Sequence, residues 1–143
     1  MVRKDEAAAM DEIRSVPLFS GLKEKQLKSV LAAGKQRNFG QGDVIVSERD
    51  MGVGFYLILG GEVEVRKRGR VLAKLGKGDF FGEMSLLDNN PRSSDVIAVA
   101  PTTCLVLSSW NFQGILKANN EIAMNLLRTL VQRLRESDKP LSD

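Results

Sequence analysis

The chain has 143 residues, of which 43% are hydrophobic and 27% charged, and a formal net charge of +3, as is ordinary for one globular domain with a core. It has no histidine and one cysteine, which argues against a zinc site, a histidine-based catalytic centre and metal chemistry of the cupin type. We therefore expect no metal and no catalytic residue.

No apolar run approaches the roughly 18 residues that a membrane-spanning helix needs. The first nine residues include basic side chains but lack the apolar core of a secretory signal, so we expect no export and a cytoplasmic location. Cys104 lies in an apolar run and is predicted to be a buried structural thiol.

The N-terminal part of the chain has helical spacing. A short helix is predicted over residues 7–16, and it ends before Pro17 because proline disfavours helical backbone in the residue before it. A second helix is predicted over 23–33, with Ser20 as a plausible N-cap and Gly34 as its stop signal.

From residue 36 onward the spacing becomes that of strands. Val63 and Val65 alternate with charged residues, the pattern of a half-buried strand. Of the 13 glycines, 10 lie between Gly40 and Gly82, where they separate short apolar segments. Many short strands divided by such turns predict a sandwich or barrel. The strand candidates are 43–46, 55–59, 62–66, 71–75 and 94–107.

Helical spacing returns after Ser108. A short helix is predicted over 109–117 and a longer one from Asn119 to about residue 136, with Asn119 or Asn120 as its cap. The apolar residues of the longer helix span about 200° of its circumference, which is wider than one contact surface needs. The helix is therefore expected to have two neighbours. One possibility is a homodimer through residues 120–136, with a seam of four residues at alternating four-three spacing: Ala123, Leu127, Leu130 and Leu134.

The segment from Phe80 to Val96 carries the most specific chemistry. Gly82 permits close approach to the backbone, and Glu83 accepts hydrogen bonds, which suits a sugar hydroxyl. Residues 83–87 can form one helical turn whose free N–H groups attract an anion. Arg92 carries a planar, permanently charged fork that matches phosphate oxygens. These groups fit a small phosphorylated sugar, and a surface turn with a solvated ion pair is the alternative.

This segment resembles the phosphate-binding cassette of cyclic-nucleotide-binding domains, whose pattern is F-G-E-aliphatic-small-L-L, a variable gap, then P-R-small-small-x-V. The segment V-P-L-F-S-G-L near the N-terminus also resembles the N-terminal helical segment of these domains. The resemblance extends from about residue 10 to 138. The cassette matches are Phe81, Gly82, Glu83, Met84, Ser85, Leu86, Leu87, Pro91, Arg92, Ser93, Ser94 and Val96.

The resemblance implies an α+β fold in one domain, 1–143, built on an eight-stranded, jelly-roll-like antiparallel β-roll. N-terminal helices would occupy about 7–34, the roll with its cassette about 36–108, and a hinge helix followed by a longer helix about 109–138. The ligand would be cAMP or cGMP, with no further cofactor. Occupancy would be transmitted through the last helix to an unidentified effector protein, since we expect no DNA-binding domain in this chain.

Residue by residue, the resemblance places Gly82 and Glu83 at the ribose 2′-hydroxyl and Arg92 at the cyclic phosphate. Met84 and Ser85 would offer backbone donors, and Ser93 would offer an N–H and a hydroxyl. The apolar positions implied to line the ligand pocket are Phe81, Val65, Leu72 and Ala73.

Ser137 and Asp138 match the position where the last helix of dimeric bacterial members reaches over the base. An ionised aspartate accepts hydrogen bonds, which suits an exocyclic amine, and a frayed terminus is the alternative. Asp95 departs from the family, because threonine or serine is frequent there. It is expected either to pair with Arg92 or to face water.

Two other functions stay open. One is a degenerate module that keeps the fold, binds no nucleotide and acts as a protein-interaction domain, although intact Gly82, Glu83 and Arg92 argue against it. The other is a sensor for another nucleotide, such as a cyclic dinucleotide, because phosphate-binding groups do not identify a base. Among the cyclic mononucleotides we expect cAMP, which stand-alone bacterial-type members mostly use.

Overall fold

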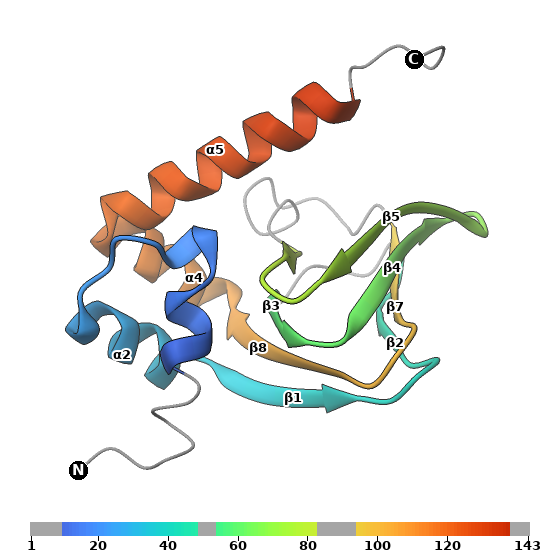
Figure 1. Ribbon diagram of the computed structural model, residues 1–143, viewed down its shortest axis with the longest axis horizontal. Coiled ribbons are helices and arrows are strands. Elements are labelled where there is room, and N and C mark those ends of the chain that lie inside the picture. Colours follow the sequence, from blue (N-terminus) through green and yellow to red (C-terminus); the bar gives the residue numbers. More distant parts are fainter. Residues whose placement is uncertain (1–9, 49–53, 83–93, 138–143) are drawn as a thin grey trace.

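The computed structural model describes residues 10–48, 54–82 and 94–137, in which two four-stranded antiparallel sheets form a roll beside a group of helices (Figure 1). This confirms the predicted eight-stranded roll. The first sheet has the order β1-β8-β3-β6 and the second the order β2-β7-β4-β5. The strands are β1 (Lys35–Phe39), β2 (Val44–Val46), β3 (Gly54–Gly60), β4 (Glu62–Lys67), β5 (Arg70–Gly76), β6 (Phe80–Phe81), β7 (Asp95–Ala98) and β8 (Thr102–Ser108).

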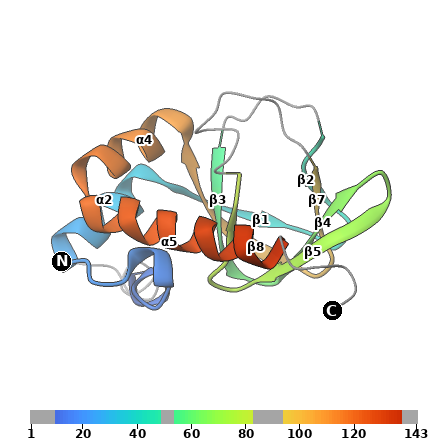
Figure 2. The ribbon, with the colours of Figure 1, turned by 90° about the horizontal axis from the view of Figure 1, so that it is seen from above.

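Helices precede and follow the roll, as expected. Residues 10–14 are helical and are followed by the 3₁₀ helix η1 (Pro17–Phe19) and by α2 (Glu24–Ala33). The chain leaves the roll through α4 (Ser109–Ala118) and α5 (Asn120–Ser137). Seen from above, α5 runs from the helical end of the molecule toward the side of the roll that carries β5 (Figure 2).

Three local predictions are wrong. Ser20 does not cap α2; the helix follows Lys23, whose N–H donates to the side chain of Gln26 at 2.9 Å. The predicted strand 94–107 is divided into β7 and β8. Strand β1 was missed because four of its five residues are exposed, so its sequence lacks the alternation of a half-buried strand. Its pairing with β8 defines it instead.

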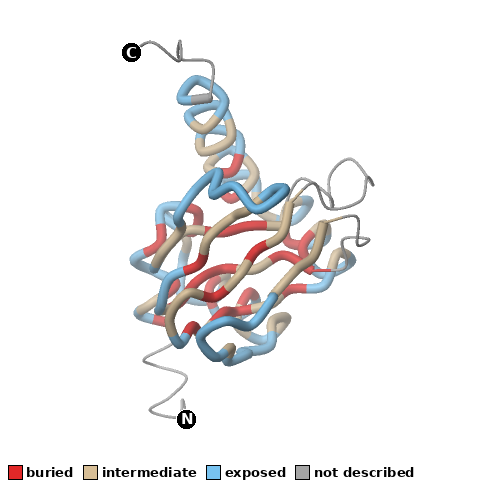
Figure 3. Tube along the Cα trace, turned by 90° about the vertical axis from the view of Figure 1, so that its right-hand side faces the viewer, coloured by how far each residue is buried: buried red, intermediate tan, exposed pale blue. Residues whose placement is uncertain are grey.

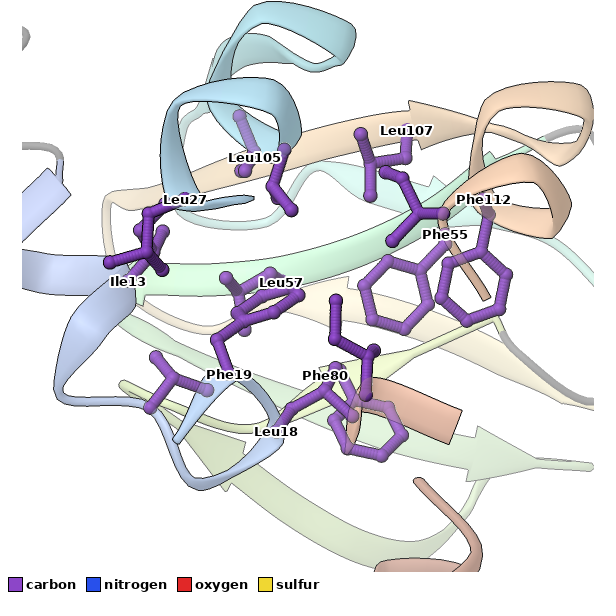
Figure 4. Packing of buried hydrophobic residues seen from close by; sticks show 14 of the residues in the cluster. Ile13, Leu18, Phe19, Leu27, Phe55, Leu57, Phe80, Leu105, Leu107 and Phe112 are labelled. Carbon is purple, nitrogen blue, oxygen red and sulfur yellow. The ribbon is translucent and has the colours of Figure 1, made fainter. Parts of the chain in front are cut away.

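The first sheet separates two hydrophobic cores because successive strand residues point to opposite faces. On one face, Phe55 and Leu57 of β3 pack with the helices, in the cluster that Figure 4 shows. Phe55 stacks on Phe112 of α4 with ring centroids 4.3 Å apart, and it contacts Phe80 of β6 at 5.5 Å. This aromatic group joins α4, β3 and β6.

The second core fills the interior of the roll. Ile58 and Cys104 from the first sheet are buried there against Val63 and Val96 from the second sheet, and Val65 packs against the same cluster. The predicted strand with Val63 inward is confirmed, since Val63 is buried while Glu64 and Arg66 form an ion pair with each other.

Cys104 is buried, as predicted, and burial raises the pKa of its thiol to about 12. The thiolate is the reactive form. Alkylation of the native protein by iodoacetamide at pH 8 is therefore expected to be at least about 100-fold slower than alkylation in denaturant. Mass spectrometry of quenched samples measures both rates, and comparable rates in the two states would contradict this burial.

The turn between β3 and β4 requires glycine at position 61. Gly61 has a φ of 99°, and a Cβ there would lie 2.5 Å from the carbonyl oxygen of Pro101. Both the backbone conformation and the close approach exclude a larger residue. This turn fixes how the chain passes from the first sheet to the second.

Helix α5 has buried and exposed residues along its length (Figure 3). Ile122 and Leu126 are buried, and Leu130 packs against the helical core. Of the four predicted seam residues, Leu127 and Leu134 are exposed, whereas Ala123 and Leu130 are partly buried. The exposed apolar stripe consists of Met124, Leu127, Val131 and Leu134, which are 47–60% exposed.

Candidate functional site

The candidate site begins where β6 ends. Phe81 pairs with Tyr56 of β3, and the two rings stack with centroids 4.9 Å apart and planes 3° apart. Gly82 follows with a φ of 95°, in the region that favours glycine. The stacked pair fixes the end of β6, and the glycine turns the chain away from the strand.

Val65 of β4 lies across the roll interior from Phe81, and both contribute to the same hydrophobic cluster. Ala73 of β5 pairs with Val65 and is exposed. Leu72 of β5 lies where the pairing register between β4 and β5 shifts, opposite Val65 and Arg66, and its side chain is 59% exposed. Phe81 and Val65 thus share the roll interior, Ala73 lies beside Val65 in the second sheet, and Leu72 is exposed on β5.

Several predicted site residues cannot be placed relative to this group. Ser137 is the last residue of α5, and the structure describes its backbone but not its side chain. The residues that lie outside the described ranges are Glu83, Met84, Ser85, Arg92, Ser93 and Asp138. Their roles stay predictions.

Asp95 has a partner that neither sequence expectation included. Its Oδ1 accepts a hydrogen bond of 2.6 Å from the backbone N–H of Glu48. The bond joins the start of β7 to the segment that follows β2. Asp95 therefore helps to hold the edge of the second sheet.

Sequence reasoning missed two contacts near the site. Tyr56 supplies the ring that stacks on Phe81, and strand alternation indicates that it faces the roll interior, since Phe55 and Leu57 face the helices. Arg133 of α5 donates a hydrogen bond of 3.0 Å from Nη2 to the carbonyl oxygen of Phe80. Its guanidinium carbon also lies 4.4 Å from the centroid of the Phe80 ring.

The described residues contain no group of three or more histidine, cysteine, aspartate or glutamate side chains that could hold a metal ion. Within the same residues, no helix is long and apolar enough to cross a membrane.

The fold and the glycine bend after β6 are those of a cyclic-nucleotide-binding β-roll. The family model described as the cyclic nucleotide-binding domain matches residues 36–119. The chain belongs to this family, which confirms the identification made from the cassette residues.

Characterised relatives agree with this assignment. The Cyclic AMP receptor protein of Thermus thermophilus is 35% identical over 134 residues, which cover 90% of this chain and 62% of the relative. A cAMP-dependent protein kinase regulatory subunit of Hypocrea atroviridis is 36% identical over 104 residues, covering 73% of this chain and 22% of the relative. The chain thus spans less than two thirds of either relative.

A solved structure has the same architecture. The crystal structure of a cyclic nucleotide-binding domain from Methylobacillus flagellatus superposes with a TM-score of 0.82 at 29% sequence identity. The match covers 91% of this chain and 80% of that structure.

Proposed function

We propose that this chain is a cAMP sensor module that reports occupancy through α5 to a separate effector protein. The observation that carries the proposal is the cassette sequence, which continues directly from the fixed Phe81 and Gly82 at the end of β6. Two relatives, a cyclic AMP receptor protein and a cAMP-dependent protein kinase regulatory subunit, support cAMP as the ligand.

In this proposal, Glu83 accepts a hydrogen bond from the ribose 2′-hydroxyl, and Arg92 binds the cyclic phosphate through its two-pronged fork. Met84 and Ser85 donate backbone N–H groups, and Ser93 adds an N–H and a hydroxyl. Val65 and Phe81 supply apolar contacts, with Leu72 and Ala73 beside them on β5. Ser137, the last residue of α5, and Asp138, the next residue in the sequence, approach the base.

Calorimetric titration with cAMP, cGMP and a cyclic dinucleotide tests this function. We expect cAMP to bind most tightly. An affinity for cGMP at least tenfold higher would reverse the choice of base, and binding of the cyclic dinucleotide alone would replace the ligand class. If none of the three binds, the interaction-domain alternative is favoured.

The exposed stripe of α5 is a candidate surface for self-association. Met124, Leu127, Val131 and Leu134 follow a three-four-three spacing, which is the spacing of one side of a two-helix coiled coil. The proposed partner for this stripe is a second copy of the chain. The stripe covers only about two heptads, so we expect a weak dimer at high concentration.

Replacing Leu127 by glutamate places a charge in this stripe and is expected to abolish the dimer. Sedimentation equilibrium at tens of micromolar, with and without cAMP, measures the association. Gln132→Glu is the matched control. Gln132 is exposed outside the stripe, and its replacement by glutamate adds the same charge as Leu127→Glu. A wild-type protein that is monomeric in both states would contradict the dimer and leave the ligand site unaffected.

A further inference from the structure

The hairpin formed by β4 and β5 ends in a strongly basic segment, residues 67–74, which we call the hairpin tip. It has no acidic residue and four cationic ones: Lys67, Arg68, Arg70 and Lys74. All eight residues of the tip are exposed. The whole chain has a formal net charge of +3, so the tip is a local concentration of positive charge that the rest of the sequence offsets.

The acidic residues near this hairpin lie closer to its base. Glu64 forms an ion pair with Arg66, and Asp95 of β7 lies opposite Arg66 in the second sheet. Arg66 is therefore compensated within the chain. Among the described residues, none forms an ion pair with a cation of the tip, so its charge remains available to a partner outside the chain.

The backbone holds the tip in a tight turn. Lys67 pairs with Arg70, which leaves a two-residue turn in which Arg68 has a φ of 52° and Gly69 a φ of 79°. Asparagine or glycine is usual at the first position of such a turn, and positive φ is uncommon for other residues. The turn thus presents a guanidinium at the apex of the hairpin in place of a residue that suits this backbone better.

Two aliphatic side chains accompany these charges. Val71 is 49% exposed and Leu72 is 59% exposed, and β5 is the last strand of its sheet among the strands described. In Figures 1 and 2 the end of the hairpin projects from the roll on the side away from α2 and α4. A flat surface can therefore contact the tip without first meeting these helices.

We propose that the hairpin tip is a docking surface for an anionic phospholipid bilayer. A negatively charged bilayer attracts each lysine or arginine near its surface, and its interface takes up exposed apolar side chains. The tip offers both chemistries side by side, because Val71 and Leu72 directly follow Arg70. This docking requires no membrane-spanning helix and is independent of the proposed nucleotide binding.

Two other polyanions match the tip less completely. Single-stranded nucleic acid is bound by aromatic side chains that stack on its bases, and residues 67–74 include none. An acidic polypeptide would satisfy the charges. Neither polyanion provides an apolar layer into which Val71 and Leu72 can insert, and a bilayer does.

Co-sedimentation of the whole chain with lipid vesicles tests the proposal in the absence of nucleotide. We expect saturable binding to phosphatidylcholine vesicles that contain about 30% phosphatidylserine, at a salt concentration of about 0.1 M. Vesicles of phosphatidylcholine alone are expected to bind at least about tenfold more weakly. No binding to either vesicle, or equal binding to both, would overturn the proposal.

The double variant Arg68→Asn, Arg70→Gln tests whether the tip is the surface that binds. Asparagine suits the positive φ at position 68, so the hairpin is expected to remain folded. Removing two cations is expected to weaken binding to the anionic vesicles by about 25-fold. The matched control, Lys25→Gln with Lys35→Gln, removes the same charge from exposed positions on α2 and β1 and is expected to stay within twofold of wild type. A tip variant within twofold of wild type would reject this surface.

Val71→Thr tests the apolar contribution, because threonine keeps the β-branched shape and replaces a methyl group by a hydroxyl. It is expected to weaken vesicle binding by about threefold. Fluorescence anisotropy with a labelled DNA oligonucleotide and with a polyglutamate peptide measures the competing partners. If the tip variant lost binding to either polyanion while Val71→Thr bound vesicles as tightly as wild type, the tip would be a general polyanion site and the bilayer proposal would be wrong.

Discussion

Replacing Arg92 by alanine is expected to weaken cAMP binding by about 30-fold to several thousand-fold. Truncating one member of a charge-assisted, two-pronged contact to a partly buried phosphate costs about 2–5 kcal/mol, and each 1.4 kcal/mol is about a factor of ten in the dissociation constant. Calorimetric titration of the purified variant measures the loss. Arg92→Lys is expected to recover little, because an ammonium is a point charge without the planar fork.

Arg37→Ala is the control for this experiment. It removes the same charge from an exposed position on β1, which pairs with β8 and lies outside the candidate site. Its affinity for cAMP is expected to match that of the wild-type protein. If Arg92→Ala remains folded and binds cAMP within threefold of wild type, the phosphate is held elsewhere and the assignment of the cassette is wrong.

The largest expected effect on stability comes from Phe112→Ala. Phe112 is fully buried and stacks on Phe55, so truncation removes the apolar transfer energy of the ring and leaves a cavity between α4 and the sheet. Losses of about 3–5 kcal/mol are typical of such substitutions. Urea denaturation followed by circular dichroism measures the change in the free energy of unfolding.

Trp110→Ala on the same helix is the matched control, because Trp110 is 85% exposed. Its free energy of unfolding is expected to change by less than about 0.5 kcal/mol. If Phe112→Ala destabilised the protein by less than about 1 kcal/mol, Phe112 would not be the central packing residue between α4 and the roll.

The sequence predicted most of the roll because its strands alternate between core and solvent. Val63 and Val65 show this pattern, and the apolar segment of β3 is covered on both faces. β1 was not predicted because both of its faces are largely exposed. Its pairing with β8 defines it as a strand. The break between β7 and β8 was missed because apolar residues continue on both sides of it.

The candidate site was predicted in part. The sequence indicated Gly82 as a point of close approach to the backbone, and the structure shows that it also has a positive φ; the family resemblance implied that Phe81 lines the pocket, and Phe81 packs in the roll interior. The contact between Arg133 and Phe80 joins residues 53 positions apart, and no local pattern indicates which backbone oxygen a distant arginine will reach. Tyr56 was missed for the same reason, since its role depends on which strand pairs with β3.

Chemical shifts test most directly whether a cyclic nucleotide binds at the end of β6. Two-dimensional ¹H–¹⁵N spectra recorded during titration with cAMP report on each backbone amide. We expect saturable shifts at Phe81 and Gly82, smaller ones at Tyr56 and Val65, and none along the exposed strand β1. Saturable binding that shifts β1 or α2 and leaves Phe81 and Gly82 unchanged would contradict this site.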